Sequence, residues 1–352
     1  MKSILPRETL RVLALFVFLF LSLYLVFYIE NLLISFVLAF VIYYLLAPIV
    51  YMCERKGMNR SVSIFSIYTL NTILVVVLFS IFIPMIIDQL ALLEKELPDL
   101  QTGVLKLVSR VENRLQSIFH FEEPLFRDNL RSWMISQTSE YTSLIPEWIS
   151  DSLTTLFLTP FLAFFMLRDG STIKRQILDL VPNRFFEISL KLLYEMNEQV
   201  GSFIRARIAE ALIVGLVTWI GLLIIGFPYA PLLALFAAIT NLIPYIGPVF
   251  GAIPAFIIVF VNNDIMFESQ SINILAVSLV YLTAHALDAI FIIPVVVAKI
   301  VNLHPVTVIL VIILGAQLLG VLGMIISIPV ASLIKLLVFT FYQHSLAPRR
   351  HL

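Results

Sequence analysis

The chain has 352 residues, of which 60% are hydrophobic and 13% are charged. A soluble domain is about 45–50% apolar and about 25% charged, so this composition excludes an ordinary soluble globular protein. The 23 Lys and Arg residues equal the 23 Asp and Glu residues, which leaves no basic excess to bind a nucleic acid. Cys53 is the single cysteine and excludes an internal disulfide and a thiolate metal cluster. No cofactor is expected.

Six apolar segments are predicted to cross the membrane as full helical spans, because each approaches or exceeds the roughly 20 residues that a span requires. The first two form a hairpin within residues 12–51, whose tip lies at Glu30 and Asn31. The other four are residues 61–87, 153–167, 208–226 and 272–297. Residues 231–261 and 305–339 are longer and are broken by Gly and Pro. The fold class is therefore an all-α, polytopic membrane protein with two broken segments.

The basic residues predict the orientation of these spans, since Lys and Arg are retained on the cytoplasmic side. Lys2, Arg7 and Arg11 place the N-terminus inside, and Arg349 and Arg350 place the C-terminus inside. The predicted regions are scaffold helices (1–87), an extracytoplasmic segment (88–151), the fourth span (152–170), cytoplasmic amphipathic helices (171–207), a transport region (208–339) and a cytoplasmic tail (340–352).

The extracytoplasmic segment carries apolar residues at heptad spacing, which predicts an amphipathic helix. They are Leu90, Leu97, Val104, Val111 and Ile118, with Leu93, Leu100 and Leu107 between them. Pro98 is expected to kink or restart this helix. The helix either caps its own transmembrane domain or contacts another subunit. The fourth span is expected to end sharply at residues 168–170, and the cytoplasmic helices either lie on the lipid headgroups or bind a regulatory partner.

An internal repeat is predicted in the transport region. Residues 241–247 and 317–323 both begin with an amide, continue through two aliphatic residues to a helix breaker, and end in Gly. This similarity suggests two copies of a span followed by a broken segment, residues 208–261 and 272–339. Two re-entrant hairpins entering from opposite faces would form an inverted repeat with a site at the midplane. The alternative is that Gly and Pro only kink the helices for packing.

Several motifs resemble the autoinducer-2 exporter family of bacterial membrane proteins. They are the Asn-Leu-Ile-Pro-Tyr-Ile-Gly-Pro run of residues 241–248, Gly-Ala-Ile-Pro of 251–254, Phe-Phe-Met-Leu-Arg-Asp-Gly of 164–170, and the 319–331 segment that follows His304 and Pro305. The resemblance implies an exporter of autoinducer-2 or a sodium or lithium/proton antiporter. It also implies the bacterial inner membrane and a ring-like homo-oligomer, a pentamer.

Ionisable residues at membrane depth are functional candidates, because burying their charge is costly. His285 and Asp288 share a helix face and predict proton or cation coupling, with a structural hydrogen bond as the alternative. Glu210 is expected to form an interfacial ion pair with Arg205 or Arg207. The predicted solute or ion pathway comprises Asn241, Pro244, Tyr245, Gly247, Pro248, Gln317, Gly320 and Gly323. The polar members of this set either hold the cargo or satisfy the local backbone.

The leading predicted function is export of a small polar solute by a secondary transporter, with autoinducer-2 as the substrate that the resemblance suggests. A monovalent cation/proton antiporter is the alternative, and a membrane scaffold is the third. The expected partners are the lipid bilayer, the solute or cation, and further copies of the chain. The sequence has no zinc-protease His-Glu-x-x-His motif, no Gly-x-Ser-x-Gly motif and no ATP-binding loop, which disfavours an enzyme or an ATP-driven pump.

Overall fold

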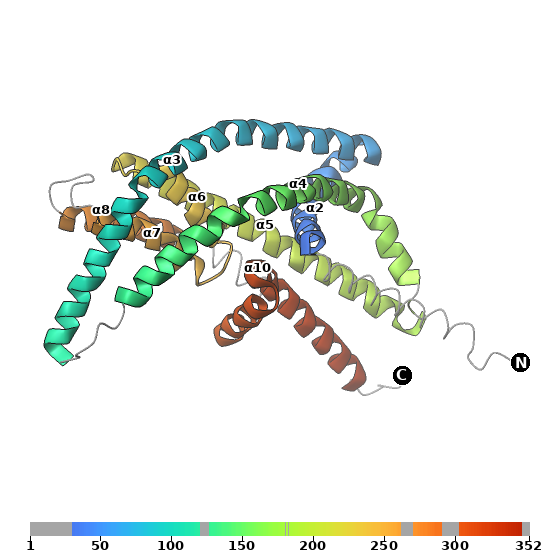
Figure 1. Cartoon of the computed structure of the whole chain (residues 1–352). Coiled ribbons are helices and arrows are strands. Elements are labelled where there is room, and N and C mark those ends of the chain that lie inside the picture. Colours follow the sequence, from blue (N-terminus) through green and yellow to red (C-terminus); the bar gives the residue numbers. More distant parts are fainter. Residues whose placement is uncertain are drawn as a thin grey trace, which may run out of the picture. The chain divides into compact units, whose positions relative to one another are not determined.

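The computed structural model describes residues 30–119, 127–179, 181, 183–261, 270–290 and 303–346, and all its regular elements there are helices (Figure 1). They are α2 (Glu30–Arg55), α3 (Arg60–Phe119), α4 (Arg127–Asp179), η1 (Asn183–Phe185), α5 (Phe186–Ile224), α6 (Ala230–Thr240), α7 (Gly247–Val261), α8 (Gln270–Leu287) and α10 (Pro305–Leu346). The predicted all-α class is confirmed. The first predicted span lies outside the described residues.

Six of the described helices are long and apolar enough to cross a membrane. Five of them contain the second to fifth predicted spans and the start of the 272–297 span, namely α2, α3, α4, α5 and α8. The sixth is α10, which the sequence predicts as a broken segment. The helices α6 and α7 have 11 and 15 residues, fewer than the roughly 20 that a full span requires.

The described residues group into two compact units. Unit 1 draws on Met1–Ile73, Pro146–Ile204 and Pro305–Leu352, and unit 2 on Leu74–Ile145 and Arg205–His304. Helices α3, α4 and α5 each contribute residues to both units. The second half of the predicted repeat is divided between them, since α8 belongs to unit 2 and α10 to unit 1. The predicted region boundaries stay predictions.

The helix α3 is far longer than a membrane span. Its 60 residues extend over roughly 90 Å at 1.5 Å per residue, about three times the hydrocarbon core. The apolar first half therefore continues directly into the charged segment predicted to lie outside the bilayer. The sequence predicts a kink or a restart near Pro98, and the restart is wrong, because the helix continues through this residue. Pro98 is accommodated within a helix that changes direction without a break (Figure 1).

The heptad residues of α3 separate into a packed line and an exposed line. Leu100 is buried in the core of unit 2, and Leu93 packs against the same core. A Cβ at Gly103 would overlap Val261 of α7, so the backbone of α3 lies close to that helix. Leu97 and Val111 remain exposed. The packed residues Leu93 and Leu100 support a helix that caps the chain's own helices. The exposed residues Leu97 and Val111 form the surface that a subunit contact would use.

The helix α4 does not end where the sequence predicts. It continues through residues 168–170 to Asp179. Arg168 pairs there with Asp169 at 2.8 Å and lies 4.4 Å from the ring centre of Phe165. Gly170 is helical, and a Cβ added to it would meet Tyr43 of α2 at an ordinary contact distance of 3.6 Å. The helix continues past this charged pair, so the predicted sharp end at residues 168–170 is wrong.

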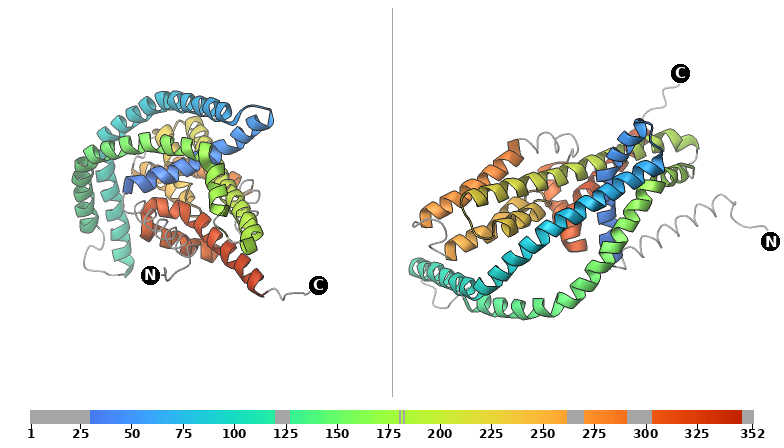
Figure 2. Two further views of the ribbon diagram at one scale, coloured as in Figure 1. Left: turned by 90° about the vertical axis from the view of Figure 1, so that its right-hand side faces the viewer. Right: turned by 90° about the horizontal axis from the view of Figure 1, so that it is seen from above.

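Both broken segments reverse direction at the predicted breakers (Figures 1 and 2). α6 and α7 pack side by side around the turn at residues 241–246. In α10 the helix is interrupted at Leu319 and Gly320, and Gly320 has a φ of +59° that glycine adopts without strain. The two arms of α10 then meet closely at Gly315 and Gly323, where an added Cβ on either would overlap the other's carbonyl oxygen. Insertion of these hairpins into the bilayer stays a prediction.

Candidate functional site

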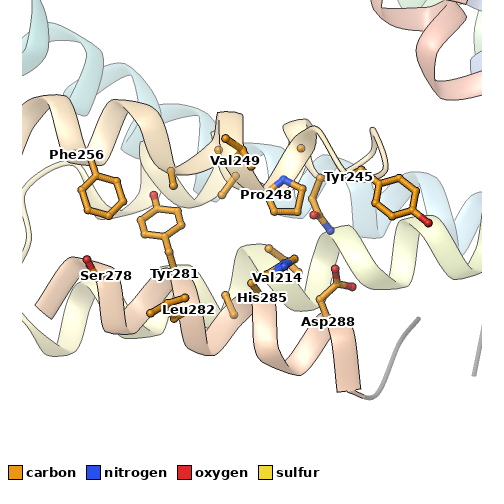
Figure 3. A pocket seen from close by; sticks show the side chains of 16 residues that line it. Val214, Tyr245, Pro248, Val249, Phe256, Ser278, Tyr281, Leu282, His285 and Asp288 are labelled. Carbon is orange, nitrogen blue, oxygen red and sulfur yellow. The ribbon is translucent and has the colours of Figure 1, made fainter. Parts of the chain in front are cut away.

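A cavity of about 350 Å³ lies in unit 2, lined by the α6–α7 hairpin, α5 and α8 (Figure 3). Its walls are largely apolar, with Val214 from α5 and Phe256 from α7 among them. The polar side chains that line it are Asn241, Tyr245, Ser278, Tyr281, His285 and Asp288. An apolar pocket with a few convergent polar groups is the usual form of a small-molecule site.

This cavity is lined both by residues of the α6–α7 turn, which is the first predicted break point, and by His285 and Asp288. Asn241, Tyr245, Gly247, Pro248, His285 and Asp288 all line it. Pro244 is buried within the turn and does not line it. Gln317, Gly320 and Gly323 lie in α10, within unit 1, and are not among its lining residues. A transport role for these residues stays a prediction.

The α6–α7 turn is held by its own backbone and by close helix packing. The amide of Gly247 donates to the carbonyl of Ile243 at 2.9 Å, and the amide of Ile243 donates to Thr240 at 2.9 Å. Tyr245 adopts a φ of +65°, which is rare for a residue with a side chain. The polar backbone of the turn is therefore largely satisfied locally, and the strained Tyr245 is positioned at the edge of the cavity.

Four polar residues lie along one side of α8, facing α7 and the turn in Figure 3. They are Ser278, Tyr281, His285 and Asp288, spaced three, four and three residues apart. This spacing keeps them on one helix face. The sequence prediction included only the last two, although the same periodicity would have identified Ser278 and Tyr281. The Tyr281 hydroxyl is buried and has no hydrogen-bond partner among the described residues.

Asp288 and His285 have different environments despite sharing this face. Asp288 is 3% exposed, whereas His285 is exposed. Asp288 begins a π turn over residues 288–290 at the end of α8, a local widening that is often found at functional sites. Its Oδ1 atom has no hydrogen-bond partner among the described residues. Of the two predicted coupling residues, Asp288 is therefore the one whose charge is more costly to bury.

Glu210 of α5 forms the predicted ion pair with Arg207. Both side chains are buried inside unit 2, and the position of this pair at the membrane interface stays a prediction. The side-chain amide of Asn241 donates to the same carboxylate oxygen of Glu210 at 3.3 Å. Asn241 therefore joins the α6–α7 turn to α5. Among the described residues, no group of three or more His, Cys, Asp and Glu side chains is arranged to hold a metal ion.

The comparisons with known proteins agree with this architecture. Residues 13–343 match the family described as AI-2E family transporter. The chain belongs to this family. It is 29% identical over 305 residues to "Putative transport protein YueF" of Bacillus subtilis (strain 168), covering 83% of this chain and 79% of the relative.

Two further relatives carry similar names. "Putative transport protein YrrI" of Bacillus subtilis (strain 168) is 27% identical over 310 residues, which are 85% of this chain and 84% of the relative. "Putative permease PerM" of Escherichia coli (strain K12) is 27% identical over 224 residues, 62% of each chain. Together with the six apolar helices, this membership indicates a multi-pass membrane protein and supports membrane transport over the scaffold alternative.

Proposed function

We propose that this chain is a secondary transporter that exports a small polar solute, and that the solute binds in the cavity beside α8. The observation that carries the proposal is the cavity itself. Its volume of about 350 Å³ falls in the range of roughly 300–1,000 Å³ that is usual for small-molecule pockets. Asn241, Ser278 and His285 offer hydrogen-bonding groups to a solute within otherwise apolar walls.

Autoinducer-2 is the candidate substrate, because the sequence motifs resemble the autoinducer-2 exporter family and the chain matches the family described as AI-2E family transporter. Everted membrane vesicles, with an imposed proton gradient, should accumulate labelled autoinducer-2 when they contain the wild-type chain. Ser278→Ala and Asn241→Ala should reduce the uptake by removing polar groups from the cavity wall. Ser109→Ala is a matched control, because Ser109 is a half-buried residue of α3, away from the cavity, and its hydroxyl donates to the carbonyl of Lys106 in the same helix. Absence of gradient-driven uptake by a folded wild-type chain would reject this substrate.

A monovalent cation/proton antiporter is a second candidate, favoured by the buried carboxyl group of Asp288 at the cavity. Everted vesicles with an internal pH reporter should then show proton movement when sodium or lithium is added. Asp288→Asn should abolish this response, because an amide cannot exchange a proton for a cation. His285→Gln tests the second predicted coupling residue in the same assay. A wild-type chain that gives no response to either cation would exclude the antiporter.

A further inference from the structure

The cavity in unit 2 has a polar wall and an apolar wall. α7 contributes apolar side chains such as Phe256, whereas the polar side chains of the α8 face lie opposite them (Figure 3). His285 and Asp288 lie near the α6–α7 turn, and Tyr281 lies toward the other end, beside Phe256. One end of the cavity therefore carries an imidazole and a carboxyl group, and the other end carries the hydroxyl groups of Tyr281 and Ser278.

The ring of Tyr281 is packed on two sides. Its centre lies 6.4 Å from the ring centre of Phe256, and the same side chain packs against the buried core of unit 2. A tyrosine side chain has only two torsions, so packing of the ring also fixes the direction of the hydroxyl oxygen. Figure 3 shows this hydroxyl pointing from α8 toward α7. The group is thus held in place before a solute binds, which lowers the cost of binding.

The buried hydroxyl group of Tyr281 has no hydrogen-bond partner among the described residues. A buried threonine such as Thr218 can turn its hydroxyl to a carbonyl of its own helix, but the tyrosine ring holds its hydroxyl out of reach of the α8 backbone. Buried tyrosine hydroxyls usually have a partner, because an unpaired polar group is costly away from water. Since Tyr281 lines the cavity, a molecule bound there can supply the partner that the described residues do not.

We propose that Tyr281 determines which solutes bind, by forming a hydrogen bond with an uncharged hydroxyl group of the cargo. The transport role rests on the proposed function, whereas the binding preference is a property of the cavity alone. A charged group at this end would lie against Phe256 and lose its hydration, which costs far more than burying a hydroxyl group. A solute that lacks the hydroxyl group leaves Tyr281 unpaired, and sites of this kind reject such analogues strongly. The cargo is therefore an uncharged, hydroxylated molecule.

Phenol and toluene form a matched pair of probes, because they have nearly the same size and differ in one hydroxyl group. Equilibrium dialysis of each radiolabelled probe, against nanodiscs with the purified chain and against empty nanodiscs, separates binding to the protein from partition into lipid. The wild-type chain should bind phenol more tightly than toluene. Tyr281→Phe should weaken the binding of phenol by about 2- to 10-fold, the effect of losing one hydrogen bond, and should leave the binding of toluene unchanged.

Tyr68 provides the matched control, since its hydroxyl group already has a partner. It donates to the carbonyl oxygen of Pro160 at 2.6 Å, between α3 and α4 within unit 1. Tyr68→Phe should lower the thermal stability of the chain and leave the binding of both probes unchanged. Tyr281→Phe removes an unpaired group, so this variant should unfold at the wild-type temperature or above it. A loss of stability like that of Tyr68→Phe would show that the Tyr281 hydroxyl is structural, and would overturn the proposal.

The binding measurements can also overturn the proposal. A wild-type chain that binds no phenol beyond the empty nanodiscs would do so, and so would a Tyr281→Phe variant that binds phenol as the wild type does or loses both probes equally. Transport is measured separately in everted vesicles. Phenol binding that depends on Tyr281, without any transport of solute, would reject the proposed function and leave the binding site at Tyr281 standing.

Discussion

Arg207 allows the acidic side chain of Glu210 to be buried inside unit 2. The two side chains form an ion pair there, and both are buried. A buried ion pair adds little stability in total, because desolvation offsets most of the attraction. Removing one partner is costly, however, because the other charge remains buried without compensation. The stability of unit 2 should therefore depend more on charge balance than on the presence of this pair.

Arg207→Met should destabilise the folded chain by about 3–5 kcal/mol, the usual cost of breaking a buried pair. The double variant Arg207→Met/Glu210→Leu should recover most of this loss, since no charge is then left without its partner. Thermal unfolding in detergent measures both effects. The exposed pair of Lys191 and Glu195, 3.7 Å apart, provides the control: Lys191→Met should change stability by less than about 1 kcal/mol. Equal effects of Arg207→Met and Lys191→Met would contradict the charge-balance argument.

Asn241→Leu should destabilise the chain by about 1–3 kcal/mol, because the carboxylate of Glu210 loses a buried donor. Asn241 is 1% exposed, so water cannot readily replace the amide. Asn113→Leu is the control, since Asn113 is exposed on α3. Thermal unfolding of both variants in the same detergent checks this prediction. A drop no larger than that of the control would show that the bond from Asn241 is not structural.

At the scale of elements, the α6–α7 hairpin depends on a close approach at its turn. A Cβ added to Gly247 would lie 2.7 Å from the Cα of Asn241, closer than real Cβ atoms approach a backbone atom. Gly251, one turn later, faces Thr240 and Ala237 in a similar way, 2.8 and 3.1 Å from their nearest atoms. These glycines let α7 pack directly on α6 and keep Asn241 at the cavity. The turn therefore positions a side chain as well as reversing the chain.

Gly247→Ala should displace the turn, and so should reduce both the thermal stability and the vesicle transport activity of the chain. Gly170→Ala is the matched control: its Cβ would meet Tyr43 at an ordinary distance of 3.6 Å. Since alanine is the better helix former, Gly170→Ala should be neutral or slightly stabilising, by up to about 1 kcal/mol. Thermal unfolding and uptake by everted vesicles are measured for both. Full activity of Gly247→Ala would show that the turn tolerates displacement.

At the scale of the whole molecule, the two hairpins belong to different compact units. The α6–α7 hairpin belongs to unit 2 with α8, whereas α10 belongs to unit 1 with α2. In each hairpin, glycine lets the two arms approach each other closely. The residue is Gly247 in the α6–α7 hairpin, and the residues are Gly315 and Gly323 in α10. The similar construction agrees with an internal repeat, and the predicted opposite orientation of the two hairpins can be measured by accessibility.

Single cysteines at two predicted loops should respond oppositely to a membrane-impermeant thiol reagent. In a Cys53→Ala background, Ile265→Cys should be labelled from outside the cell, because its loop contains Asp264 and Glu268 and no basic residue. Lys299→Cys should be labelled only after the cytoplasmic side is opened. Mass spectrometry of intact cells and everted vesicles gives both readings. Full spans in place of re-entrant hairpins would produce the opposite pattern.

The sequence by itself determined the helical class, the apolar spans, the two break points and the family, since each depends on local composition or on motifs in chain order. It also predicted the ion pair of Glu210, three residues from Arg207. Only the tertiary structure joined Asn241 to Glu210 and placed Asn241 and Asp288 at one cavity, because these residues lie on elements whose packing has no local signal. It likewise showed that α3 continues through Pro98, where a kink or restart was predicted, and that α4 continues through Gly170, where an end was predicted. The preference of Pro and Gly to end a helix is weak, so tertiary packing can override it. The placement of a buried charge depends on every element around it, and no local pattern shows it.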